Sequence, residues 1–194
     1  MSSSWTEIAG AVLGLIQIVL LVRRSVWNFP VAMAMVTLIG ITLFGARLYS
    51  ESGLQAFFFV VNALGWYQWS RVRDGGNAVP VSWMTAHARI RWAVVTVLLS
   101  VSLGWAMQRF TDAALPFADS AVTGASIAAQ LLLNNRRVEN WLLWVAIDVV
   151  SVGLYLTRDL QFLAALYAAF LVISVIGLRQ WMRAAKPIPA GAIA

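Results

Sequence analysis

The chain has 194 residues, of which 61% are hydrophobic and 11% are charged, and its formal net charge is +6. A soluble domain of this length cannot bury so much apolar surface, so the composition indicates an integral membrane protein. The chain has no cysteine, which excludes disulfides and thiolate metal sites.

Long apolar runs between basic loops predict the membrane spans. A helix needs roughly 20 residues to cross the hydrocarbon core, with about 17–25 tolerated. Seven such helices fit the sequence, at residues 5–22, 28–46, 53–70, 91–108, 118–135, 139–157 and 160–180. We therefore predict an all-α integral membrane protein with seven transmembrane helices.

The third predicted helix carries a polar and aromatic face. At about 100° per residue, one arc of about 100° contains Gln55, Phe58, Phe59, Asn62, Trp66 and Trp69. Asn62 lies mid-membrane, where an unsatisfied amide costs several kcal/mol. Two interpretations stay open: Asn62 hydrogen-bonds a neighbouring helix, or this face lines a substrate path.

The longest predicted loop, residues 71–90, contains a Gly-Gly pair and a proline and follows three helices. It predicts four segments: a first three-helix bundle at 1–70, the loop with a linking fourth helix at 71–112, a second three-helix bundle at 113–184, and a cytoplasmic tail at 185–194.

Similar residues in the two bundles suggest an internal repeat. At an offset of 114, Gly10 matches Gly124 and Trp27 matches Trp141, whereas at 112 the pairs are Gly65 with Gly177 and Trp69 with Trp181. Because one helix separates the bundles, both would cross the membrane in the same direction. This predicts a parallel 3+1+3 repeat with a cavity between its halves.

The sixth predicted helix has a continuous polar and aromatic stripe. An arc of about 100° contains Asn140, Trp141, Trp144, Asp148, Ser151 and Tyr155. An ionised carboxylate in lipid costs at least ~2.5 kcal/mol, so this stripe should face protein or a wet cavity. Asp148 could simply pair with an arginine or cap a neighbouring helix. Alternatively, indole faces hold a flat and especially a cationic ring, while the amide and carboxylate take hydroxyls or positive charge.

Tryptophans near predicted helix ends are typical of the aromatic belt at a membrane surface. This set contains Trp5, Trp27, Trp69, Trp83, Trp92, Trp105 and Trp181.

The basic residues are distributed unequally between the two sides of the membrane. One side takes eleven and the other keeps three, namely Arg47, Arg109 and Arg158. This bias predicts an external N-terminus and a cytoplasmic C-terminus. The positive charge is thus explained by topology, and no nucleic-acid partner is expected.

Clustered catalytic chemistry is missing from the sequence. His87 is the single histidine, and there is no HExxH, no GxSxG and no phosphate-binding glycine loop. We therefore expect no enzyme activity, no metal site, no cofactor and no ATP-driven pump within this chain.

The segment NRRVENWLLWVAIDVVSVGLYL, together with GWYQW, resembles the PnuC-type family of bacterial vitamin transporters, best known for nicotinamide riboside. The resemblance extends from about Trp5 to Trp181. Its most specific parts are the ENWxxW…D helix and the glycine-to-tryptophan signatures at 65–69 and 177–181. The second signature reads GLRQW, so Arg179 stands where the first has Tyr67.

This resemblance implies the 3+1+3 helix order of SWEET sugar transporters, a homotrimer, and a place in the bacterial cytoplasmic (inner) membrane. It also implies facilitated diffusion, with substrate retained after a cytoplasmic kinase phosphorylates it. The family's substrate region falls on Asn140, Trp141 and Trp144. Other members resemble transporters of thiamine, riboflavin or deoxynucleosides.

The sequence thus predicts a lipid-embedded carrier that moves a vitamin nucleoside, nicotinamide riboside in the first place, by alternating access. Candidate substrate-binding residues are Trp141, Trp144, Asn140, Asp148, Asn62, Gln55, Trp66 and Tyr155. One alternative is a carrier of another vitamin or nucleoside. The other is a non-transporting assembly or sensory subunit, in which the polar residues form a packed seam.

Overall fold

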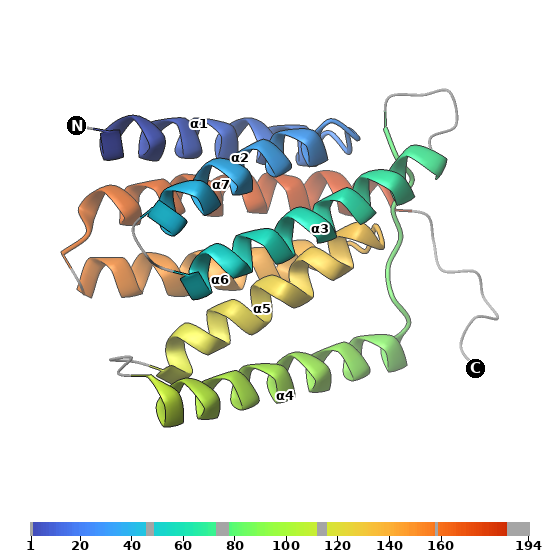
Figure 1. Ribbon diagram of the computed structural model, residues 1–194. Helices are drawn as coiled ribbons and strands as arrows, with labels where there is room; N and C mark the ends of the chain where they lie inside the picture. The colour runs from blue at the N-terminus through green and yellow to red at the C-terminus, as the bar shows by residue number, and fades with distance from the viewer. Residues whose placement is uncertain (1, 46–48, 73–77, 112–115, 158, 186–194) are drawn as a thin grey trace. The chain divides into compact units, whose positions relative to one another are not determined.

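The computed structural model describes residues 2–45, 49–72, 78–111, 116–157 and 159–185 (Figure 1). These residues form seven helices: α1 (Ser2–Val22), α2 (Asn28–Gly45), α3 (Tyr49–Val72), α4 (Ala86–Phe110), α5 (Pro116–Asn134), α6 (Asn140–Thr157) and α7 (Gln161–Ala184). The all-helical class is confirmed. The tail predicted at 185–194 lies, apart from Ala185, outside the described residues.

Several helices are longer than the predicted spans. Helix α4 starts five residues before the predicted residue 91 and contains Arg89 and Arg91. A charged residue ends an apolar run without ending a helix, because arginine has good helix propensity. Thr85 accounts for the actual start, since its side chain accepts a hydrogen bond from the Ala88 N–H at the N-cap.

Four helices of the described chain, α2, α4, α6 and α7, are long and apolar enough to cross a membrane. Helix α1 has a shorter apolar run at Ile8–Val22. Helices α3 and α5 contain no equally apolar stretch of that length among the described residues. The structure therefore supports a multi-pass membrane protein, while the full set of seven spans stays a prediction.

The chain divides into two compact units, residues 1–80 and 81–194, which we call unit 1 and unit 2. In unit 1, α2 packs against both α1 and α3. Phe29 and Trp69 are fully buried there, and their rings meet edge to face with centroids 5.0 Å apart.

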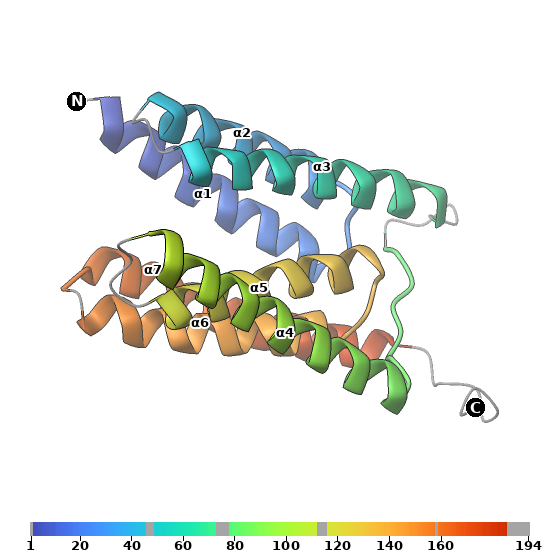
Figure 2. The same cartoon turned by 60° about the horizontal axis from the view of Figure 1, so that its bottom comes forward.

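In unit 2, α4 packs on α5, α5 on α6 and α6 on α7 (Figure 2). Two glycines allow the close approach of α4 and α5. A Cβ on Gly104 would lie 2.5 Å from the Phe117 ring, and a Cβ on Gly124 would collide with Ser100. Small residues at such contacts let helix backbones approach closely inside a membrane.

The two units share one corner motif at a constant offset of 112. Arg24 and Arg136 follow α1 and α5 with positive φ angles of 56° and 58°. Four residues later, the Asn28 amide donates to the Ser25 carbonyl at 2.7 Å and the Asn140 amide donates to Arg137 at 2.6 Å. The internal repeat thus has a matching local geometry in each unit.

The same offset corrects one of the sequence pairings. Trp141 meets Trp181 edge to face, as Phe29 meets Trp69, so Phe29 and not Trp27 is the counterpart of Trp141. The pairing at 114 is wrong because it aligned two tryptophans that occupy different places. Trp27 is 64% exposed.

The aromatic-belt prediction is also wrong for two residues. Trp69 and Trp181 are fully buried within their units, where they cover Phe29 and Trp141. Trp5 and Trp105 are largely exposed, as belt residues should be.

Candidate functional site

The polar stripe of α6 is turned toward protein. Asn140, Trp141, Asp148 and Ser151 are buried, while Trp144 and Tyr155 are half-buried. The opposite side of the helix is exposed and apolar, with Leu142, Val149, Val150 and Leu156. Helix α7 runs beside α6 in both ribbon views and covers part of this stripe (Figures 1 and 2).

Trp141 lies in a socket formed by the glycine-to-tryptophan signature of α7. Its ring packs against Trp181 with centroids 5.7 Å apart and an interplanar angle of 81°. A Cβ on Gly177 would lie 2.5–2.7 Å from the benzenoid edge of Trp141. The absent side chain of Gly177 therefore makes room for the indole, and Trp181 closes the socket.

Asp148 is hydrogen-bonded to an uncharged residue of α7. The Ser174 hydroxyl donates to Asp148 Oδ2 at 2.8 Å, and both residues are buried. Within the described part of the chain, no basic side chain pairs with this carboxylate. The alternative in which an arginine neutralises Asp148 is therefore not found there.

Several buried polar atoms at the start of α6 have no hydrogen-bond partner among the described residues. They are Asn140 Oδ1, Trp141 Nε1, Trp144 Nε1 and Glu139 Oε2. Leaving a buried donor or acceptor unpaired costs about 1–3 kcal/mol. Such atoms call for a specific explanation, and a bound molecule that supplies the missing bonds is one. Glu139 and the first two turns of α6 thus have two unpaired hydrogen-bond donors and two unpaired acceptors.

Tyr155 lies at the other end of the stripe. It packs against Tyr167 of α7, with ring centroids 5.1 Å apart. Fourteen residues separate Tyr155 from Trp141, which corresponds to about 21 Å along a helix. The structure therefore does not bring Tyr155 together with the two tryptophans.

The predicted third-helix residues belong to unit 1 and have different surroundings. The buried Asn62 donates to the Phe58 carbonyl at 2.8 Å. Gln55 packs on Gly40, whose added Cβ would lie 3.2 Å from that of Gln55. Trp66 is exposed. At the offset of 112, Asn62 is the counterpart of Ser174, the hydrogen-bond donor to Asp148.

Glu139 is a residue that sequence reasoning did not select. It is buried beside Asn140, and its Oε1 accepts from the Met84 N–H at 2.9 Å and from Arg89 Nε at 2.8 Å. These partners lie 55 and 50 residues earlier in the chain, so no helical periodicity could reveal them. Its position next to the stripe, within the ENW motif, was the only available signal.

Comparison with known proteins places the chain in a family. Residues 4–183 match the model of the family described as nicotinamide mononucleotide transporter. The chain belongs to this PnuC transporter family.

Two relatives of the chain carry different substrates in their names. The chain is 30% identical to the nicotinamide riboside transporter PnuC of Escherichia coli K12, in an alignment covering 94% of this chain and 87% of the relative. It is 31% identical to the riboflavin/roseoflavin transporter RibM of Streptomyces davaonensis, covering 97% and 91%. The chain is therefore a membrane transporter, and its family is not one of enzymes.

A solved structure supports the fold of the PnuC family for this chain. The crystal structure of the vitamin B3 transporter PnuC is similar with a TM-score of 0.76. The match covers 93% of this chain and 81% of that one, at 21% sequence identity.

Proposed function

We propose that this transporter carries a flat, ring-bearing vitamin nucleoside, nicotinamide riboside in the first place. The observation that carries the proposal is the set of unpaired, buried donors and acceptors at the start of α6. A carboxamide has one carbonyl acceptor and an NH₂ donor. An indole N–H can bind its carbonyl while Asn140 Oδ1 accepts from its NH₂.

Asp148 supports a cationic ring as the transported group. The pyridinium ring of nicotinamide riboside carries a permanent positive charge. Trp144 and Asp148 are four residues apart and therefore share a face of α6. An indole face and a carboxylate that pairs with no basic side chain of the described residues together favour such a ring.

Riboflavin is the second candidate, because RibM, with 31% identity, is named as a transporter of that vitamin. The flavin ring also has carbonyl acceptors and an imide N–H donor, so the unpaired atoms of α6 suit it too. The flavin is neutral, however, and gives Asp148 no charge to meet. The buried carboxylate is the feature that favours nicotinamide riboside.

Our proposal for the wider transport cycle rests on the resemblance to the family and on the predicted topology. We propose seven spans in the 3+1+3 order, with the fourth helix linking the two bundles, in the bacterial inner membrane. Residues 1–70 and 113–184 would move relative to each other in alternating access. A homotrimer and trapping of the substrate by phosphorylation complete the proposal.

Uptake into liposomes tests the proposed function. Purified protein is reconstituted, and radiolabelled nicotinamide riboside and riboflavin are offered separately over a range of concentrations. We expect saturable uptake, with nicotinamide riboside preferred. If no compound of a vitamin panel is taken up saturably, the proposed substrate class is wrong.

A tryptophan substitution, followed by measurement of substrate affinity, tests whether the start of α6 binds the substrate. Trp144→Phe keeps an aromatic ring but removes the unpaired indole N–H, so we expect about three- to tenfold weaker substrate binding. The exposed Trp27→Phe is the matched control and should bind like the wild type. Equal affinity of both variants would show that the Trp144 N–H does not contact the substrate.

A further inference from the structure

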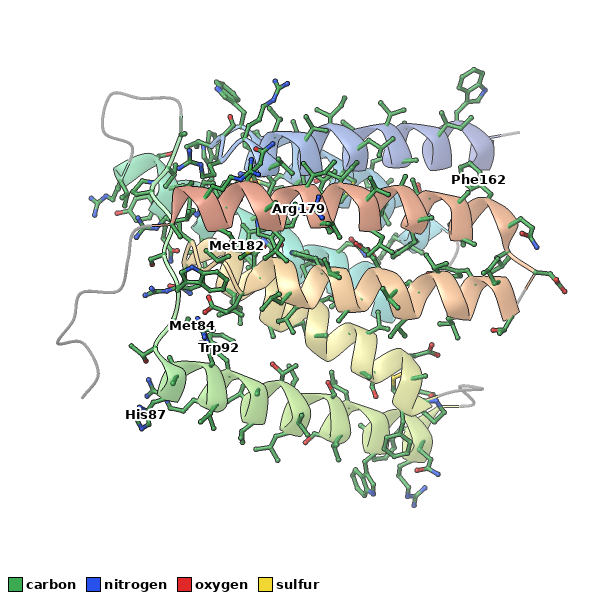
Figure 3. The ribbon with its side chains drawn as sticks, turned by 180° about the vertical axis from the view of Figure 1, so that it is seen from behind. Met84, His87, Trp92, Phe162, Arg179 and Met182 are labelled. Atoms are coloured by element: carbon green, nitrogen blue, oxygen red, sulfur yellow. The ribbon has the colours of Figure 1, made fainter. Side chains whose placement is uncertain are left out.

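The carboxylate of Glu139 holds the segment that leads into α4. Its Oε1 accepts two hydrogen bonds, from the Met84 N–H and from Arg89 Nε. The Arg89 side chain is 48% exposed and that of Glu139 only 7%. Figure 3 shows Met84 in the chain just before α4. A buried carboxylate with two donors fixes the geometry of both partners.

A second set of bonds joins the same segment to the corner between α5 and α6. The Ser82 N–H donates to the Arg136 carbonyl, and the Val138 N–H donates to the Ser82 carbonyl, both at 3.1 Å. Arg137 Nη1 donates to Ser82 Oγ at 2.7 Å. We call Ser82–Met84 with Arg89, Arg137 and Glu139 the clasp.

The clasp connects two helices that do not otherwise meet. Helices α4 and α6 each pack on α5 and not on one another. Within the described residues, the clasp is therefore what ties the start of α4 to the start of α6. The first N–H groups of α6 are paired with the corner itself, since those of Asn140, Trp141 and Leu142 donate to the carbonyls of Arg137, Val138 and Glu139. The clasp therefore fixes where this hydrogen-bonded turn lies relative to α4. A carboxylate at this end also interacts favourably with the helix dipole.

We propose that the Arg89–Glu139 pair positions the first turn of α6 for substrate binding. Glu139 directly precedes Asn140 and Trp141, so its anchoring sets where their side chains lie. Arg89 acts through Glu139 and is a positioning residue. This inference rests on the proposed function for its effect on affinity, but the order of the helix turn can be measured without any substrate.

Spin labels provide that measurement, because the chain has no native cysteine. One cysteine replaces Leu142, which is 49% exposed beside Trp141, and in a separate protein one replaces Val150, which is 50% exposed farther along α6. We expect Arg89→Gln and Glu139→Gln to raise label mobility at 142 and to leave it unchanged at 150. Arg109→Gln, which removes an exposed arginine at the other end of α4, is the matched control and should change neither.

Binding measurements then test the effect on the substrate. Loss of a hydrogen-bonded charge pair predicts about tenfold weaker binding of nicotinamide riboside in either glutamine variant. Uptake should show a raised KM with a nearly unchanged maximal rate. Arg89→Lys, which keeps a cation, should restore most of the affinity. Because the two residues act as one pair, the double glutamine variant should be no worse than the poorer single variant.

Three outcomes decide between the inferences. Wild-type mobility at 142 together with wild-type affinity in Arg89→Gln overturns the positioning role. Loss of affinity in Glu139→Gln alone would mean that Glu139 contacts the substrate directly. If the wild type binds neither vitamin, the proposed function fails, while the labels still report whether the clasp orders α6. Should Glu139→Gln not fold, Arg89→Gln provides the test, since that side chain is half-exposed.

Discussion

Asp148 is the residue whose chemistry best separates the two candidate substrates. Asp148→Asn keeps an acceptor for the Ser174 hydroxyl but removes the negative charge. We expect the affinity for the cationic nicotinamide riboside to fall about tenfold or more, since the attraction between two unit charges about 4 Å apart is worth roughly 1 kcal/mol in water and roughly 4 kcal/mol near a protein surface. The affinity for neutral riboflavin should change little. Calorimetry with each compound checks this, and an equal loss for both would mean that Asp148 acts only through packing.

Gly177 determines whether Trp141 can enter its socket. Gly177→Ala places a methyl group against the indole, and such overpacking costs typically about 1–3 kcal/mol. We expect a lower apparent unfolding temperature in detergent and weaker substrate binding. Gly153→Ala on α6 is the matched control, because a Cβ there meets nothing within 4 Å. It should leave the protein equally or slightly more stable; equal destabilisation by both would contradict the socket.

Among the secondary-structure elements, the α5–α6 corner depends on a left-handed residue. Arg136 has φ 58°, and burial together with the adjacent Arg137 lowers its pKa from the usual value. Both Arg136→Gly and Arg136→Ala remove the charge, so their difference reports the backbone alone. In the left-handed region we expect the glycine variant to be more stable than the alanine variant by about 1 kcal/mol.

At Arg91 we expect the same two substitutions to differ in stability in the opposite direction. Arg91 lies exposed within α4, where alanine is favoured over glycine by about 1 kcal/mol. Thermal unfolding of the four proteins measures both differences. If the alanine variant is the more stable one at both positions, the corner does not require the positive φ angle.

For the whole molecule, the distribution of arginines predicts how the chain crosses the membrane. Asn135→Cys follows α5 and Thr111→Cys follows α4, and both sites are exposed in a chain without other cysteines. In intact cells, a membrane-impermeant maleimide should label position 111 but not position 135. Permeabilised cells are the control, in which both should react. The reverse pattern would place the N-terminus in the cytoplasm.

Helix positions and the inward stripe of α6 could be predicted because both are properties of neighbouring residues. An apolar run of fixed length indicates a span, and the 3.6-residue period assigns Asn140, Trp141 and Asp148 to one face. The motif around these residues also indicated the family, which the comparison confirmed. The wet cavity that the stripe was predicted to face, and the substrate-binding roles of the stripe residues, stay predictions.

Only the tertiary structure decided which side chains meet. Gly177 and Trp181 of α7 form the socket of Trp141. Asp148 is hydrogen-bonded to Ser174, and Glu139 is hydrogen-bonded to Arg89. These partners lie tens of residues apart, and their meeting depends on how helices pack and on the loop lengths between them. Periodicity determines the face on which a residue lies, whereas only packing determines what that face touches.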